Sequence, residues 1–350
     1  MKKAVFFTAC CLLAFTLNAQ RTTNEQPFGL STGFKAQLQE EVLVQAPDMN
    51  LMTRDEADIE RWGGPVPYAV AIGVHFTSEN MGVWQDLDDG SKIWRLKVYV
   101  PGALGTNTYY DKFWLPEGGK FFIYSEVTKQ TIGAIISEFI AGSKESPSEY
   151  ANSLIYGDKL VYEYYQPASV KEYPIISISR IDYAYRYVYN PYSIGLRNFG
   201  DALGCNININ CSEGNNWQAE KHAVARVSVP LGGYSIWCSC ALVNNTKNDY
   251  TPYVLTADHC FSDTLGIRYY DATGSSSEHP NASSNANLMI FFWEYEHPGC
   301  SNSITEPTPR SSIGATVVAN NTLSDFGLLK LIEDPRNVAG VAPYYLGWDR

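Results

Sequence analysis

Short segments with alternating apolar and polar residues run through the first half of the chain and restrict it to a sheet-forming fold. In the clearest of them, residues 94–100, Trp, Leu and Val occupy every second position and Arg, Lys and Tyr stand between them. A period of two places alternate side chains on opposite faces of a strand, so this segment predicts a strand with one buried face. Similar strand-like segments occur at 68–76, 113–115, 121–124, 131–140 and 160–165. We therefore expect residues 65–167 to form an all-β sandwich.

The composition agrees with a sheet protein and excludes one class of partner. Aromatic residues make up 13% of the chain, with 24 Tyr, and charged residues only 18%. Aromatic side chains are favoured in strands, where they pack on the pleated surface. The net charge of −11 would repel phosphates, so we expect no nucleic-acid partner. Nothing in the sequence indicates a cofactor, and the oligomeric state has no signature in it.

The N-terminus has the features of an export signal. A basic start, Met1-Lys2-Lys3, precedes an apolar run that is too short to span a membrane, and the small residue Ala19 follows. This pattern predicts a signal peptide over residues 1–19, cleaved after Ala19, which removes Cys10 and Cys11. No later segment is apolar enough to cross a membrane. The mature protein is therefore expected to be secreted or periplasmic, where disulfides form.

Four regions follow the signal peptide. Residues 20–64 are a polar leader, in which the capping box Thr53–Glu56 predicts a short helix ending near Trp62. The sandwich at 65–167 leads to a Tyr-rich connector at 168–204, in which a processing site is expected between Arg197 and Cys205. Two segments of this connector, 175–181 and 184–189, are each able to add a strand. The last region, 205–350, contains all six cysteines that remain after the signal peptide, namely Cys205, Cys211, Cys238, Cys240, Cys260 and Cys300.

The candidate chemistry lies in residues 205–350. Strands are expected at 224–229, 235–243, 253–255, 288–295 and 324–331. The strand at 253–255 leads through Thr256 and Ala257 to His259, which Cys260 follows. A histidine held at a strand end beside a cysteine has the fixed ring orientation that general-base catalysis requires. The alternative is a buried histidine with a structural role.

Five motifs in this region resemble, in the same order, the secreted lysyl endopeptidase group of trypsin-like serine proteases. They are the pair Cys205 and Cys211, Cys238–Asn245, Thr256–Cys260, Ser324–Leu329 and Gly347–Asp349. The preceding sandwich resembles the propeptide of the same group through Trp94–Leu96, Pro101–Leu104 and Phe113–Gly118. The resemblance implies a propeptide sandwich followed by the first barrel of a chymotrypsin-like double β-barrel, with the second barrel essentially missing.

The resemblance also implies roles for individual residues. His259 matches the general base, and Asp325 matches the carboxylate that orients its ring. Disulfides are implied between Cys238 and Cys260 and between Cys211 and Cys300.

Two cysteines and one acid depart from the family pattern. Cys205 and Cys240 have no implied partner; they are expected to be unpaired or bonded to each other, since six cysteines allow 15 pairings. Cys238-Ser-Cys240 lacks the usual zinc spacing, so no metal site is expected. Asp258 precedes His259, where the family has a neutral residue. Because neighbouring strand residues face opposite ways, Asp258 is not expected to be the orienting acid.

The nucleophile is the main departure. No Gly-x-Ser-Gly turn follows Asp325, and the run Gly274–Ser277 precedes the acid in the wrong order. The chain is therefore expected to be C-terminally truncated, without the nucleophile, oxyanion hole or specificity pocket, and inactive alone. The expected function is that of a secreted serine endopeptidase precursor, a zymogen acting on polypeptides. The alternative is a secreted pseudoprotease or binding module whose aromatic sandwich contacts protein or glycan.

Overall fold

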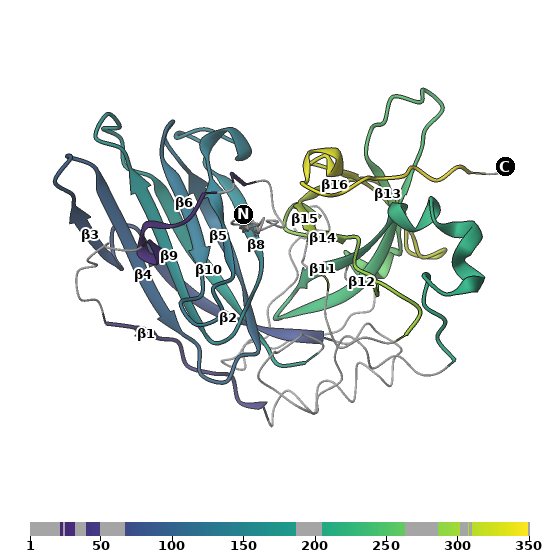
Figure 1. Ribbon diagram of the computed structural model, residues 1–350, viewed down its shortest axis with the longest axis horizontal. Coiled ribbons are helices and arrows are strands. Elements are labelled where there is room, and N and C mark those ends of the chain that lie inside the picture. Colours follow the sequence, from purple (N-terminus) through teal and green to yellow (C-terminus); the bar gives the residue numbers. More distant parts are fainter. Residues whose placement is uncertain are drawn as a thin grey trace, which may run out of the picture.

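The chain forms two lobes that lie side by side (Figure 1). The computed structural model describes residues 22–23, 25–31, 40–49, 67–186, 205–262, 286–301, 307 and 310–348. Residues up to 186 form one lobe and residues from 205 onward form the other. Both are built from strands with a few short 3₁₀ turns, so the expected all-β class is confirmed. The expected signal peptide, the helix at 53–62, the processing site at 197–204 and Gly274–Ser277 lie outside the described residues.

The N-terminal lobe is a sandwich of two β-layers. One layer has the order β1-β4-β9-β6-β7, with β3 paired to β4, where β1 is Val42–Leu43, β3 Val83–Asp86, β4 Lys92–Tyr99, β6 Lys120–Tyr124, β7 Thr131–Ile135 and β9 Lys159–Gln166. The other layer has the order β2-β10-β5-β8, where β2 is Pro67–Thr77, β5 Gly105–Trp114, β8 Ser148–Tyr156 and β10 Ile175–Ala184. Side chains from both layers share one apolar core, to which Trp94, Phe113 and Ile178 contribute.

Strand β4 contains the alternating segment, yet part of its polar face is also buried. Trp94 and Leu96 point into the core as the alternation predicts, but Arg95 is only 5% exposed. Its guanidinium lies 3.5 Å from Glu163 on β9. The carboxylate of Glu163 also accepts hydrogen bonds from the backbone amides of Phe28 and Gly29. An N-terminal segment that local alternation does not reveal therefore covers this face, and burial raises the pKa of Glu163.

Strand β10 corrects the expected boundary of the sandwich. It pairs with β2 on one side and with β5 on the other, in the middle of its layer. The expected limit at residue 167 is therefore too early, and residues 175–184 of the expected connector belong to the sandwich. The segment 131–140 is shorter as a strand than expected, since β7 ends at Ile135 and the turn Ser137–Phe139 follows.

In the C-terminal lobe, the described residues form seven strands that pair antiparallel in one sheet. Their order is β15-β14-β11-β12-β13-β17-β16. The bounds are β11 Val224–Leu231, β12 Tyr234–Val243, β13 Tyr253–Thr256, β14 Ile290–Trp293, β15 Arg310–Ile313, β16 Ala315–Asn321 and β17 Phe326–Leu331. Among the described residues the pairings do not close a barrel. Among the described residues from Tyr344 onward, Leu346 forms an isolated bridge with Val243.

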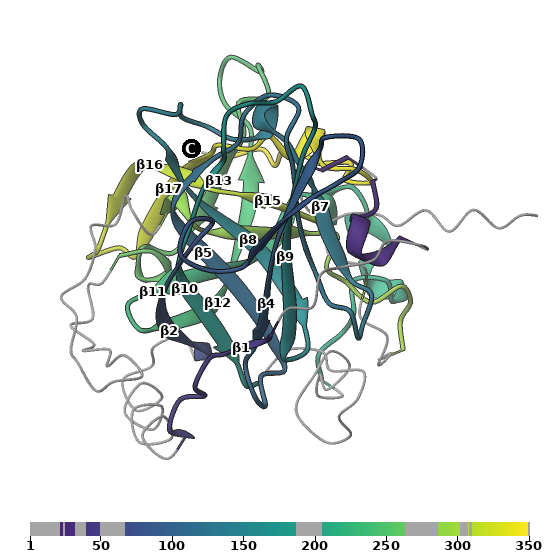
Figure 2. The ribbon, with the colours of Figure 1, turned by 90° about the vertical axis from the view of Figure 1, so that its left-hand side faces the viewer.

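The two lobes share one continuous sheet of eleven strands. Strand β2 of the sandwich pairs with the start of β12, with Tyr234 opposite Val70 and Ser235 opposite Ala69. Figure 2 shows the strands of the sandwich in front of those of the C-terminal lobe. The strand pairing joins the lobes by backbone hydrogen bonds, which a flexible connection would lack.

A buried group of charged and polar side chains reinforces this junction. Arg180 on β10 forms an ion pair of 2.6 Å with Asp182. It also donates to the carbonyl of Gly232 at 3.0 Å and that of Tyr234 at 2.8 Å. The hydroxyl of Ser235 on β12 donates to Asp182 at 2.5 Å. We call Arg180, Asp182 and Ser235 the interlobe clasp, because each joins groups of both lobes.

Candidate active site

His259 lies just beyond the end of β13. This strand is held between β12 and β17, with Leu255 opposite Ala241 on one side and Leu328 on the other. The chain leaves the strand at Ala257 and forms the 3₁₀ turn Asp258–Cys260. His259 therefore belongs to a turn, whereas the sequence predicted that it lies at the end of a strand. The turn leaves the imidazole side chain 36% exposed.

Asp325 contacts His259 at two atoms. Its Oδ2 lies 2.8 Å from Nδ1 of the ring. Its Oδ1 accepts a hydrogen bond of 3.0 Å from the backbone amide of His259. That backbone hydrogen bond is the main favourable contribution that lowers the pKa of Asp325, and the ring contact adds to it. An ionised Asp325 accepts the Nδ1 proton, and Nε2 is then the ring atom able to take a proton.

The backbone around Asp325 is shaped for this contact. Asp325 has a φ of 53° and ends the turn that connects β16 to β17. Two residues later, a Cβ on Gly327 would lie 2.4 Å from the ring of Phe261. The glycine therefore lets the segment after His259 pack directly against β17. The sequence contained Gly327 within the motif, but not the contact that requires it.

A disulfide lies next to the histidine. Cys260 is bonded to Cys238 on β12, which ties the His259 turn to the neighbouring strand. The sulfurs of these cysteines and a ring nitrogen of His259 lie within 4.8 Å of one another. Metal binding by cysteine needs a thiolate, and both sulfurs are already bonded to each other. This cluster is therefore a clamped histidine and not a metal site.

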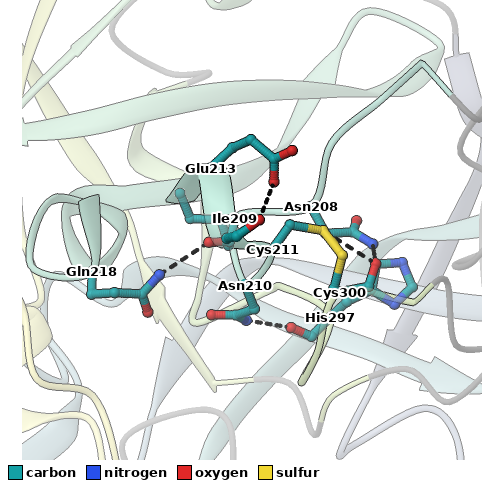
Figure 3. Close-up of a disulfide and its surroundings, with 9 residues drawn as sticks. Asn208, Ile209, Asn210, Cys211, Glu213, Gln218, His297 and Cys300 are labelled. Carbon is teal, nitrogen blue, oxygen red and sulfur yellow. Dashed lines mark hydrogen bonds between the residues drawn. A yellow bond between two sulfur atoms is a disulfide. The ribbon is translucent and has the colours of Figure 1, made fainter. Parts of the chain in front are cut away.

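A second disulfide ties the first residues of the C-terminal lobe to the segment after β14. Cys211 is bonded to Cys300, and Figure 3 shows two asparagine side chains beside this bridge. Asn208 donates to the carbonyl of Cys300 at 2.6 Å, and Asn210 donates to that of His297 at 2.5 Å. Residues 205–211 form turns and bends and no strand.

The two remaining cysteines are free thiols and are not bonded to each other. Cys205 is exposed and Cys240 is buried. Burial raises the pKa of the Cys240 thiol, which favours the inert, protonated form.

Another histidine–carboxylate pair was not predicted. Nδ1 of His222 lies 2.8 Å from Glu294 at the end of β14. The carbonyl of His222 accepts from the amide of Tyr344, and Glu294 accepts from the amide of Ala342. The pair thus holds the C-terminal segment against the lobe. A histidine beside a carboxylate is therefore no proof of catalysis in this chain, and the motif around His259 is needed as well.

Asp258 faces away from the ring of His259. Its side chain is fully buried and accepts from Asn320 at 2.7 Å and from Thr322 at 3.0 Å. Asp325, and not Asp258, is the carboxylate on the imidazole.

The C-terminal lobe is an all-β domain with a disulfide-clamped histidine and an aspartate on Nδ1, as in serine proteases. Residues 199–350 match the family described as "Lysyl endopeptidase, C-terminal domain". The C-terminal lobe is therefore similar to the C-terminal domain of lysyl endopeptidases. Among the described residues, no helix is both long and apolar enough to cross a membrane.

Proposed function

We propose that this chain is part of a secreted serine endopeptidase precursor in which His259 is the general base. The observation that carries the proposal is the double contact of Asp325 with the ring and the backbone amide of His259. With Nδ1–H donated to Asp325, Nε2 takes the proton of a serine hydroxyl as it attacks the peptide carbonyl. The imidazolium, stabilised by Asp325, then protonates the departing amine.

We assign the nucleophile to sequence outside residues 1–350. In the family order the serine follows the aspartate, and residues 325–350 contain no Ser, Thr or Cys. We propose that the oxyanion hole and the specificity pocket come from the same part of the protein as the nucleophile. Residues 1–350 alone are therefore proposed to be inactive. The complete protein is proposed to cleave polypeptides on the C-terminal side of Lys, in keeping with the name of the matching family, lysyl endopeptidase.

We further propose that residues 1–19 export the protein and that the sandwich is a pro-region. The two disulfides support an oxidising destination. Cleavage between Arg197 and Gly204 would separate the pro-region from the C-terminal lobe.

The alternative, a binding module that uses the aromatic sandwich, has less support. Many of its aromatic side chains are buried in the core and not presented to a partner, among them Trp94, Tyr110, Tyr124, Tyr162, Tyr164, Phe113, Phe121 and Phe122. We therefore keep this function only as an outcome of the test below.

The test compares variants of the full natural gene product that contains residues 1–350, assayed on peptides with Lys, Arg or Leu at the cleaved position. His259→Ala should reduce kcat by about a million-fold, and Asp325→Asn by about ten thousand-fold, because the base and its orientation are lost in turn. His222→Ala is the matched control, because it removes a histidine that also has a carboxylate partner, and it should keep most of the activity. An active His259→Ala protein would disprove the proposal. A natural protein that hydrolyses none of the peptides would favour the binding module.

A further inference from the structure

The carboxylate of Asp258 is buried one residue before the proposed base, and the proposed chemistry does not use it. Its side chain has no exposed surface. A buried carboxylate is costly unless hydrogen bonds compensate it. Its two side-chain donors are Asn320, at 2.7 Å, and Thr322, at 3.0 Å. Asn320 lies near the end of β16 and Thr322 lies in the turn that joins β16 to β17, and both are distant in sequence from Asp258.

The turn between β16 and β17 contains Asp325 and is exposed. Residues 318–326 are all exposed, and Leu323 in the middle is 99% exposed. Turns with few buried contacts open easily in native proteins. Asp325 must nevertheless stay within hydrogen-bond distance of a ring that is itself partly exposed. A buried anchor for the turn would supply this constraint.

The backbone extends the same contact. The amide of Asp258 donates to the carbonyl of Asp325 at 3.2 Å. The carbonyl of Asp258 accepts from both the amide and the hydroxyl of Ser262, each at 2.9 Å, which closes the His259 turn. Residues 258 and 259 therefore bind the Asn320–Asp325 segment at both of its ends.

We propose that Asp258 is a positioning residue, whose buried carboxylate anchors the β16–β17 turn through Asn320 and Thr322 and so keeps Asp325 on His259. The consequence for catalysis rests on the proposed function, but the geometric part does not. Hydrogen bonds to an ionised acceptor are roughly twice as strong as neutral ones. Weakening the anchor should therefore loosen the His259–Asp325 contact without touching either residue.

The test uses the 350-residue chain and needs no hydrolysis. Two NMR signals report the contact, namely the Nδ1 proton of His259 and its backbone amide, since both point at Asp325. Thr322→Val and Asn320→Ala remove one donor each and keep the charge of Asp258. Both should make these protons exchange with water about tenfold faster or more. Asp258→Asn, which keeps one acceptor oxygen, should have a smaller effect than Asp258→Ala.

Two controls separate anchoring from general loosening. Thr316→Val makes the same chemical change on β16, at a hydroxyl that donates to Lys330 and not to Asp258, and should leave both signals unchanged. Because Thr322 acts through Asp258, the double variant Asp258→Ala/Thr322→Val should exchange no faster than Asp258→Ala alone. Wild-type exchange in Thr322→Val and Asn320→Ala would overturn the proposal, and these variants answer the question even if Asp258→Ala fails to fold.

In the complete protease, the same variants should lower kcat and leave KM nearly unchanged, because they displace the base and not the substrate site. If Thr322→Val and Asn320→Ala exchange faster but the wild-type protein hydrolyses no peptide, the anchor is supported and the proposed function is disproved. Hydrolysis that His259→Ala abolishes, but that Thr322→Val and Asn320→Ala leave unchanged, would do the reverse.

Discussion

Asp325 keeps its charge mainly because of its contacts with His259. The amide and the ring of His259 each hold one of its carboxylate oxygens. Both contacts favour the ionised form, which is why its pKa lies below the ordinary value although its side chain is about half exposed. Asp258, the residue before His259, has a different environment, because its buried carboxylate accepts hydrogen bonds from Asn320 and Thr322. Asp258 and Asp325 thus have different roles, because their carboxylates face different partners.

The lowered pKa predicts how the pair responds to acid. A carboxyl whose pKa is lowered by folding contributes stability above its unfolded pKa, and that contribution is lost as the pH falls through the folded pKa. The His259–Asp325 contact should therefore persist at pH 5 and open below the ordinary aspartate pKa of 3.8. The measurement is the protection of the His259 amide against exchange as a function of pH. Asp325→Asn should remove this acid-dependent step, and a step that persisted in this variant would assign the response to another group.

Among the elements, the turn after β13 is fastened from three directions. The Cys238–Cys260 disulfide joins it to β12, the Asp258 carboxylate joins it to the β16–β17 turn, and Phe261 packs on Gly327. The disulfide closes a segment with a sequence separation of 22 residues. A link of this length restricts the unfolded chain as well as the folded turn.

Removing this disulfide should lower stability and loosen the site together. Replacing both Cys238 and Cys260 by Ser should lower the free energy of unfolding by about 3 kcal/mol, as the loop length implies. Urea unfolding followed by tryptophan fluorescence measures this loss. Replacing the buried free Cys240 by Ala is the matched control, since it removes a thiol that closes no loop. A double variant as stable as wild type would show that the bridge is dispensable.

At the scale of the whole molecule, the interlobe clasp makes the sandwich part of the same folded unit as the C-terminal lobe. Arg180 reaches from β10 to the carbonyls of Gly232 and Tyr234, and Asp182 beside it is fully buried. A pro-region held in this way would stay associated with the C-terminal lobe after cleavage of the connecting chain, because the strand pairing and the clasp do not depend on covalent continuity.

Arg180→Ala should destabilise the junction, because it leaves Asp182 buried without its cation. Loss of one partner of a buried ion pair costs about 3–5 kcal/mol. The thermal unfolding transition of the chain should occur at a lower temperature, and a protease should cut the chain between the lobes more readily. Lys144→Ala, which breaks the exposed pair with Glu172, is the control and should change little. Equal stability of the two variants would mean that the clasp contributes nothing.

Local patterns predicted the elements better than their limits. Strands were expected where apolar and polar residues alternate or where apolar residues cluster, and β4, β6, β9, β11, β12 and β13 lie there. β1, β3, β8, β15, β16 and most of β5 were missed, because these segments are short or their apolar residues do not alternate clearly with polar ones, and neighbouring strands stabilise them. His259 was placed at a strand end because a 3₁₀ turn of three residues leaves no periodicity to detect.

By itself, the sequence determined the all-β class, the cysteines available for disulfides and the motif that singles out His259 and Asp325, because these follow from residue types and short spacings. Only the tertiary structure decided that β10 completes the sandwich, that β2 pairs with β12, that His222 has its own carboxylate and that Asp258 accepts hydrogen bonds from Asn320 and Thr322. These contacts join residues far apart in the chain. Their partners are chosen by burial and by the need to satisfy buried polar groups, which no local pattern specifies.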